Sequence, residues 1–195
     1  YNKRMVKVAV LYGGPSPAYP DSLRTGNFVL SLLRGYEEYE PIDVFISKQG
    51  DWYYKGLVEE PYRILSRADV VWNALHGSYG EDGEVQKIMD NLQMPFVGSP
   101  AVPSAFSHNK ELAKKLYRDH SLPALSHEVL RAGEVTDERL IEIFRSYLHP
   151  VIVKPSTGVR GIGVRLAHTF QELKDAIEKA FVHSSKVLVE EFVRG

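Results

Sequence analysis

Short apolar runs that each end in a polar, glycine-containing loop are the feature that most constrains how this chain can fold. Three runs have this form: Val6 to Leu11 before "YGGPSP", Asp69 to Leu75 before "HGSYGEDG", and Val151 to Val153 before "KPSTGVRGIG". Runs of this length, bounded by turn residues, are typical of buried strands. Because ligands of open α/β sheets bind where the strands end, the three loops are also the first candidates for a functional site.

The first half of the chain alternates strand and helix patterns. A helix is expected from about Ser22 to Leu33, a second strand over Ile42 to Ser47, and a further helix with Val85, Ile88, Met89 and Leu92 on one face. This order predicts mainly parallel pairing, with helices on both faces of the sheet. We therefore predict a Rossmann-like α/β domain over residues 1–98.

The composition changes in the second half, which begins with the proline-containing stretch "SPAVPSAFSHNK" at Ser99. Three helices are expected there: one with Leu112, Ala113, Leu116 and Tyr117 facing inward, one from Thr136, and one opened by the capping box of Thr169 and Glu172. Strands are expected over Val151–Val153, Gly163–Leu166 and Lys186–Val189. We predict an α+β domain with a small sheet over residues 99–195.

Composition excludes several classes of protein. The chain of 195 residues has no cysteine, so disulfides, thiol catalysis and thiolate metal sites are ruled out within it. Its formal net charge is -1 and no long block of like charge occurs, so nucleic-acid binding has no support. No apolar run approaches the length of a membrane span. These features predict a protein of the cytoplasm that binds neither nucleic acid nor membrane.

Each loop has a functional and an ordinary interpretation. In the first, Gly13 and Gly14 let a ligand approach the backbone, but the segment also reads as a loop and helix cap. In the second, His76 offers an imidazole, and Glu81 precedes a helix, where an acid also suits the helix dipole. The crowding of glycines, a histidine and acids favours function there.

The third loop combines glycines with basic residues. Lys154, at the end of a buried strand, and Arg160 in the loop would place positive charge beside phosphates held by backbone N–H groups. The alternative is a plain hairpin with a lysine that reaches solvent. Lys110 is either a second phosphate contact or a solvated helix lysine. Glu190 and Glu191 form either a hinge that pairs with an adenine or surface acids on an edge strand.

Five segments, in order, resemble the D-alanine–D-alanine ligases of the ATP-grasp superfamily. They are "VAVLYGG…S…SLRTG", "NALHGSYGEDGEVQ", "PFVGS…SAFSHNKELAKKL", "PVIVKPS…GIGV" and "KVLVEEFVRG". The resemblance runs along nearly the whole chain. It implies the N-terminal and central ATP-grasp domains, ATP and Mg²⁺ as cofactors, and the synthesis of D-alanyl-D-alanine for peptidoglycan through an acylphosphate. It also suggests a homodimer.

The resemblance assigns roles to individual positions. Lys110 and Lys154 correspond to the lysines that bind ATP phosphates, and His76 and Glu81 fall in the substrate-side signature. The candidate catalytic residues are His76, Glu81 and Arg160. The flexible loop over the phosphates corresponds to Ser156, Gly158, Gly161 and Gly163. The adenine hinge corresponds to Glu190, Glu191, Phe192 and Val193.

The chain departs from the family pattern in three ways. Ala18 stands where the family has a glutamate for the ammonium of the first D-alanine, and Arg160 and Gly161 replace two serines. The family's third domain, which carries the metal ligands, does not follow Gly195, so we expect a fragment that is inactive alone. The alternatives are a binding module without catalysis, or a ligase for other amino or hydroxy acids, since an acid without an α-ammonium would suit Arg160 better.

Overall fold

The chain forms two compact units, which are described separately. The computed structural model describes residues 4–194. The chain divides after Ala105, so that the second unit begins at Phe106. Helix α4 (Ala101–His108) runs across this division, whereas the change in composition begins earlier, at Ser99.

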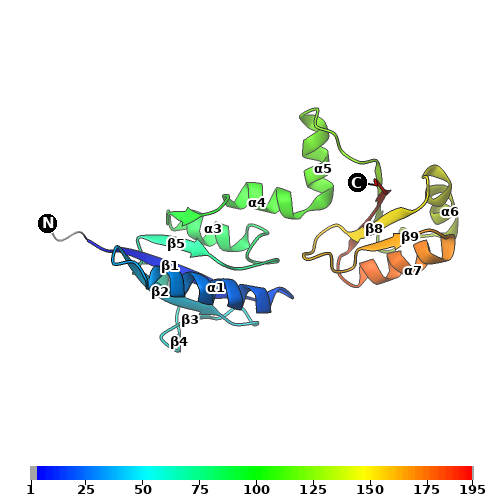
Figure 1. The fold of residues 1–195 in the computed structure, drawn as a ribbon. Helices are drawn as coiled ribbons and strands as arrows, with labels where there is room; N and C mark the ends of the chain where they lie inside the picture. The colour runs from blue at the N-terminus through cyan, green and yellow to red at the C-terminus, as the bar shows by residue number, and fades with distance from the viewer. Residues whose placement is uncertain (1–3, 195) are drawn as a thin grey trace. The chain divides into compact units, whose positions relative to one another are not determined.

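The first unit is built on a six-stranded sheet (Figure 1). Its strand order is β4-β3-β2-β1-β5-β6, and its strands are β1 (Val6–Gly13), β2 (Tyr39–Ile46), β3 (Trp52–Tyr54), β4 (Leu57–Val58), β5 (Val70–Asn73) and β6 (Phe96–Val97). The pairs β1–β2, β1–β5 and β5–β6 are parallel, while β3 and β4 add an antiparallel edge. The predicted parallel core is confirmed.

Helices cover both faces of this sheet. On one face α1 (Tyr19–Leu33) packs Val29, Leu30 and Leu33 against Val8 and Val10. On the other face α2 (Pro61–Leu65) and α3 (Glu84–Asn91) bury Ile64, Leu65, Val85 and Met89 with Leu11, Val44 and Val71. Successive strand residues point to opposite faces, so β1 supplies both cores. This arrangement brings the carboxyl ends of β1 and β5 to one edge.

The second unit has a four-stranded antiparallel sheet in the order β7-β10-β8-β9. The strands are β7 (His127–Arg131), β8 (Val151–Pro155), β9 (Arg165–Ala167) and β10 (Lys186–Glu191). One face is covered by α6 (Asp137–Ser146) and α7 (Phe170–Phe181), and Figure 1 shows α7 running along β8 and β9. Thr136 and Thr169 cap these helices as expected from the sequence, each accepting a backbone N–H.

The opposite face of the second sheet is polar near its centre. Val151, Val153, Val187 and Val189 lie in the helix-covered core. Because side chains alternate along a strand, Lys154 on β8 and Glu190 on β10 point to the other face. The face away from the helices therefore carries Lys154 and Glu190 beside the apolar Ile152 and Leu188.

Strand β4 and helices α2 and α4 were not expected from the sequence, and two further features differ from the prediction. No strand was expected at His127–Arg131, yet β7 pairs along β10 at the edge of the sheet. Helix α5 (Lys110–Asp119) was expected to bury Leu112, Leu116 and Tyr117, but each of these is exposed. Its buried residues are Ala113 and Lys114, and Lys114 forms an ion pair with the buried Glu190 of β10.

Candidate functional site

A cavity of about 330 Å³ opens on the charged face of the second unit. It is lined by Ser107, Lys110, Ala113, Lys114, Tyr117, Pro123, Ala124, Leu125 and Lys154. Three lysines from α5 and β8 thus share one space, whose volume is near the lower end of the range for small-molecule sites. The two lysines singled out in the sequence, Lys110 and Lys154, line the same cavity although 44 residues separate them in the chain.

Lys110 is held at the start of α5, where the helix meets the glycine-rich loop. Asn109 caps the helix and accepts the N–H groups of Glu111 and Leu112. The Lys110 backbone N–H donates to the Ser156 carbonyl, and its Nζ lies 3.3 Å from the Gly158 carbonyl oxygen. Burial lowers the pKa of Lys110, and the positive charge of Lys154 lowers it further, against the opposing effect of Glu190. An anion in the cavity would relieve this repulsion.

Lys154 is fixed by an ion pair with Glu190 across the sheet. In the β8–β10 register Lys154 faces Leu188 and Ile152 faces Glu190, so Lys154 and Glu190 are diagonal neighbours on one face. Their Nζ and Oε1 atoms form the ion pair. The Lys154 side chain keeps 20% of its surface exposed, whereas that of Glu190 keeps 4%. The ammonium group is thus anchored on one side and open on the other.

The glycine-rich loop after β8 adopts a backbone that glycine favours. Gly158, Gly161 and Gly163 have positive φ angles, and so does Arg160 at 56°. A side chain at Gly163 would approach Pro155 and His183 within 3 Å, whereas none of the described atoms lies within 4 Å of one at Gly158 or Gly161. The loop therefore needs glycine for its backbone conformation, and at Gly163 also for space.

Ser156 anchors the start of this loop. It is buried, its Oγ donates to Asn109 Oδ1 at 3.1 Å, and its N–H donates to the Lys186 carbonyl. The hydroxyl thereby joins the loop to the cap of α5, which carries Lys110.

The predicted hinge lies at the end of β10. Glu190 is buried, Glu191 is partly buried, and Phe192 and Val193 are 39% and 59% exposed. Glu191 is tied to the segment before β7, because its N–H donates to the Ser126 carbonyl and its carboxylate accepts the Ser126 N–H at 2.8 Å. The chain leaves the sheet here as exposed apolar residues.

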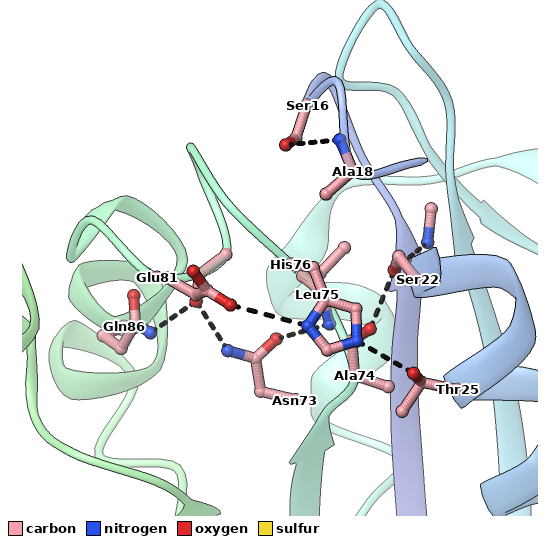
Figure 2. A network of polar contacts seen from close by, with 12 residues as sticks. Ser16, Ala18, Ser22, Thr25, Asn73, Ala74, Leu75, His76, Glu81 and Gln86 are labelled. Carbon is pink, nitrogen blue, oxygen red and sulfur yellow. Dashed lines mark hydrogen bonds and ion pairs between the residues drawn. The ribbon is translucent and has the colours of Figure 1, made fainter. Parts of the chain in front are cut away.

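The first unit carries a second polar network where β1 and β5 end (Figure 2). The imidazole of His76 lies between Thr25 and Glu81: its Nε2 is 2.8 Å from Thr25 Oγ1, and its Nδ1 is 3.4 Å from Glu81 Oε1. The two predicted residues of the "HGSYGEDG" loop are thus brought together. Their side chains are 36% and 47% exposed, so both are open to a ligand.

Buried hydrogen bonds hold that network in place. Ser22 Oγ accepts the Gly13 N–H and donates to the Ala74 carbonyl, both at 2.8 Å, and so joins α1 to the ends of β1 and β5. The side-chain amides of Asn73 and Gln86 both donate to the Gly80 carbonyl. Figure 2 shows these groups around His76.

Ala18 occupies a closed position in the first loop. It is 1% exposed, and its N–H donates to Ser16 Oγ at 3.1 Å. Ala18 is the N-cap residue of α1, and its side chain makes no capping hydrogen bond. The position thus holds a buried methyl group, whereas the family resemblance of the sequence implies a carboxylate there.

Residues 4–194 contain neither a cluster of metal ligands nor a helix suited to cross a membrane. No three histidine, aspartate or glutamate side chains in this described part are close enough together to hold a metal ion. Within the same range no helix has both the length and the apolar character that crossing a membrane requires.

Comparisons with solved structures identify the fold. The D-alanine-D-alanine ligase from Coxiella burnetii superposes with a TM-score of 0.84 at 22% identity, covering 97% of this chain and 64% of that one. The VanG D-Ala:D-Ser ligase from Enterococcus faecalis superposes with a TM-score of 0.81 at 26% identity, covering 98% and 64%. The chain therefore has the two-sheet α/β architecture of these ligases.

Sequence comparisons identify the family. Models described as D-ala D-ala ligase N-terminus and C-terminus match residues 58–99 and 116–195. The D-alanine--D-alanine ligase of Geobacter sulfurreducens is 35% identical over 194 residues, and that of Solibacter usitatus is 32% identical over 190 residues. The chain belongs to the D-alanine–D-alanine ligase family. It spans 56% and 57% of the length of these two relatives, and 98% and 97% of its own length is matched.

Sequence reasoning missed several residues of both networks. Lys114 lines the cavity and pairs with Glu190, Asn109 connects α5 to Ser156, and Thr25 contacts His76. Lys114 follows Lys110 by four residues, so helical spacing could have placed both on one side of α5. The contacts of Asn109 and Thr25 depend on tertiary structure, for which the sequence carries no local signal.

Proposed function

We propose that this chain is the N-terminal and central part of an ATP-dependent carboxylate–amine ligase that forms D-alanyl-D-alanine for peptidoglycan precursors. The observation that carries the proposal is that Lys110 and Lys154 line one cavity beside a glycine-rich loop. Two ammonium groups beside backbone N–H groups suit the charge of a triphosphate. The family relationship supports the same reading.

The proposed chemistry depends mainly on positioning. The γ-phosphoryl group passes from ATP to a carboxylate oxygen of the first D-alanine, and ADP leaves. The amine of the second D-alanine then attacks the acyl carbon, phosphate leaves and the amine loses a proton. Lys110 and Lys154 would hold the phosphates, while Glu190 to Val193 would offer backbone groups to the adenine. Bound Mg²⁺ would neutralise further phosphate charge, on ligands proposed to lie outside this chain.

The polar network around His76 in the first unit would bind a substrate. His76 is held by Thr25 and faces Glu81, so it could donate a hydrogen bond to a substrate carboxylate while Glu81 accepts one from an amine. Arg160, in the loop after β8, would attract a carboxylate.

A ligase for a different first substrate is the second candidate. The observation that favours it is Ala18, a buried methyl group at a position where the family has a glutamate for the substrate ammonium. Without that carboxylate an ammonium would lose affinity on the order of 1–3 kcal/mol. A hydroxy acid, or an acid without an α-ammonium, would not have this requirement.

A chimera tests both candidates. The 195 residues would replace the matching part of the Geobacter sulfurreducens ligase, and dipeptide and phosphate would be measured with D-alanine, ATP and Mg²⁺. Dipeptide formation supports the proposal. ATP binding without any product from D-alanine or from hydroxy acids would instead indicate a binding module without catalysis.

The double variant Ala18→Glu/Arg160→Ser of that chimera tests the choice of substrate. We expect it to raise the rate with D-alanine relative to D-lactate, a hydroxy acid of the same carbon skeleton. An unchanged ratio would contradict the role given to these two positions.

We further propose a cytoplasmic homodimer, on the strength of the family resemblance and of a composition without cysteine. Light scattering after size-exclusion chromatography measures the mass of the assembly. A monomer at all concentrations would contradict the dimer.

A further inference from the structure

Lys114 completes a cluster of buried charges behind the cavity. Its Nζ lies 2.9 Å from Glu190 Oε2, while the other oxygen of Glu190 pairs with Lys154. One carboxylate is therefore shared between two lysines, one from α5 and one from β8. Lys114 also donates to the Leu125 carbonyl at 3.3 Å, in the segment that lines the cavity before β7.

Glu190 and Lys114 are buried, so each charge depends on its ion pair for stabilisation. Glu190 is 3% exposed and Lys114 is 9% exposed. A charge this far from water is tolerated only when it is paired, and removal of one partner leaves the other uncompensated. His127 is the cross-strand neighbour of Glu190, and burial together with the nearby lysine and arginine charges lowers its pKa. Lys114 and Lys154 are thus the two cationic partners of Glu190 in this cluster.

Sharing the carboxylate affects the charge that the cavity presents. A carboxylate paired with Lys154 alone would cancel its charge. With Lys114 included, the three groups carry two positive charges and one negative charge, a net +1. Lys110, which also lines the cavity, brings the net charge to +2. Lys154 can therefore be fixed in position while the wall stays attractive to a polyanion.

We infer that Glu190 and Lys114 are positioning residues for Lys154, which hold its ammonium group toward the cavity to meet the phosphates of a nucleotide. The inference rests on the proposed nucleotide site and adds to it, because the hinge role uses only the backbone of Glu190. Its side chain acts through Lys154, and Lys114 holds that side chain against α5.

The substitution Glu190→Gln separates positioning from charge. It keeps the size of the side chain and raises the net charge of the cluster by one unit. If Glu190 mattered only as a negative charge near the phosphates, its loss would strengthen ATP binding. If it positions Lys154, ATP binding weakens in spite of the added positive charge, because an amide cannot pair with both lysines.

The experiment measures ATP and adenosine binding to the 195-residue chain by NMR titration, which detects weak complexes. We expect Glu190→Gln to weaken ATP binding roughly tenfold, about the effect of one charge-assisted contact, and to change adenosine binding less than about twofold. Equal or tighter ATP binding in a folded variant would overturn the inference. An unmodified chain that binds neither compound would instead contradict the proposed nucleotide site.

Lys114→Met is the second variant, with Lys115→Met as its matched control. Both remove one positive charge from neighbouring positions of α5, but Lys115 is exposed and lies outside the cluster. We expect Lys114→Met to weaken ATP binding by roughly fivefold to tenfold and Lys115→Met by less than about twofold, since an exposed charge is screened by salt. Equal effects of the two variants would show that Lys114 acts only through its charge and would overturn the positioning role.

Discussion

Lys110 Nζ lies 3.3 Å from the Gly158 carbonyl oxygen, so a cavity lysine connects α5 with the glycine-rich loop. We expect Lys110→Met to release this part of the loop, because methionine has no group that can donate a hydrogen bond to the Gly158 carbonyl. Hydrogen exchange of the backbone amides over residues 157–164 should become faster. Lys115→Met is the control, and unchanged exchange in the Lys110 variant would show that the contact does not restrain the loop.

The charge of Lys110 should destabilise the fold at neutral pH. Burial and Lys154 lower its pKa in the folded state, so the unfolded chain binds the proton more tightly. The loss of folding stability is complete at pH values below the lowered pKa. It becomes smaller as the pH rises from there toward the ordinary pKa of lysine. We therefore expect Lys110→Met to raise the free energy of unfolding, relative to the unmodified chain, more at pH 7 than at pH 10. Urea unfolding at the two pH values measures this difference. A difference independent of pH would contradict this.

Gly163 should tolerate substitution less well than Gly161. Both have positive φ angles, but a methyl group at Gly163 would lie 2.7 Å from Pro155 Cγ and 2.8 Å from His183 Cδ2. We expect Gly161→Ala to lower the free energy of unfolding by about 1 kcal/mol through its backbone alone, and Gly163→Ala by roughly 2–4 kcal/mol. Urea unfolding measures both. Equal losses would mean that the neighbouring rings move aside.

Ser22 should matter more for stability than its exposed neighbours on α1. Its hydroxyl satisfies the Gly13 N–H and the Ala74 carbonyl, and it is fully buried. We expect Ser22→Ala to lower the free energy of unfolding by roughly 2–3 kcal/mol, since it leaves two buried backbone groups without this partner. Ser31→Ala, on the exposed side of the same helix, serves as the control. Similar values for both would contradict the structural role.

The sequence predicts the position of the loops better than their contacts. Apolar runs followed by glycine marked the ends of β1, β5 and β8 to within two residues, because buried strands and sharp turns have local signatures. Strand β7 has only two aliphatic residues among the five in "HEVLR", and it is defined by pairing with the distant β10. Its register on β10 could not be predicted from the residues of β7 and their sequence neighbours.

The charged cluster shows the same limit. Lys114 and Glu190 are 76 residues apart, and nothing near either residue in sequence marks them as partners. The predicted apolar face of α5 was wrong for a related reason. Helical periodicity places Leu112 and Leu116 on one side, but tertiary packing turned Ala113 and Lys114 toward the interior.

The central claim is that Lys110 and Lys154 act together on the phosphates of one nucleotide. Calorimetric or NMR titration of the chain with ATP and with adenosine, for Lys110→Met, Lys154→Met and the Lys115→Met control, tests it most directly. We expect each of the first two variants to weaken ATP binding at least about tenfold while adenosine binding and the control stay within about twofold. ATP binding that is unaffected by either substitution, or weakened equally for adenosine, would contradict the claim.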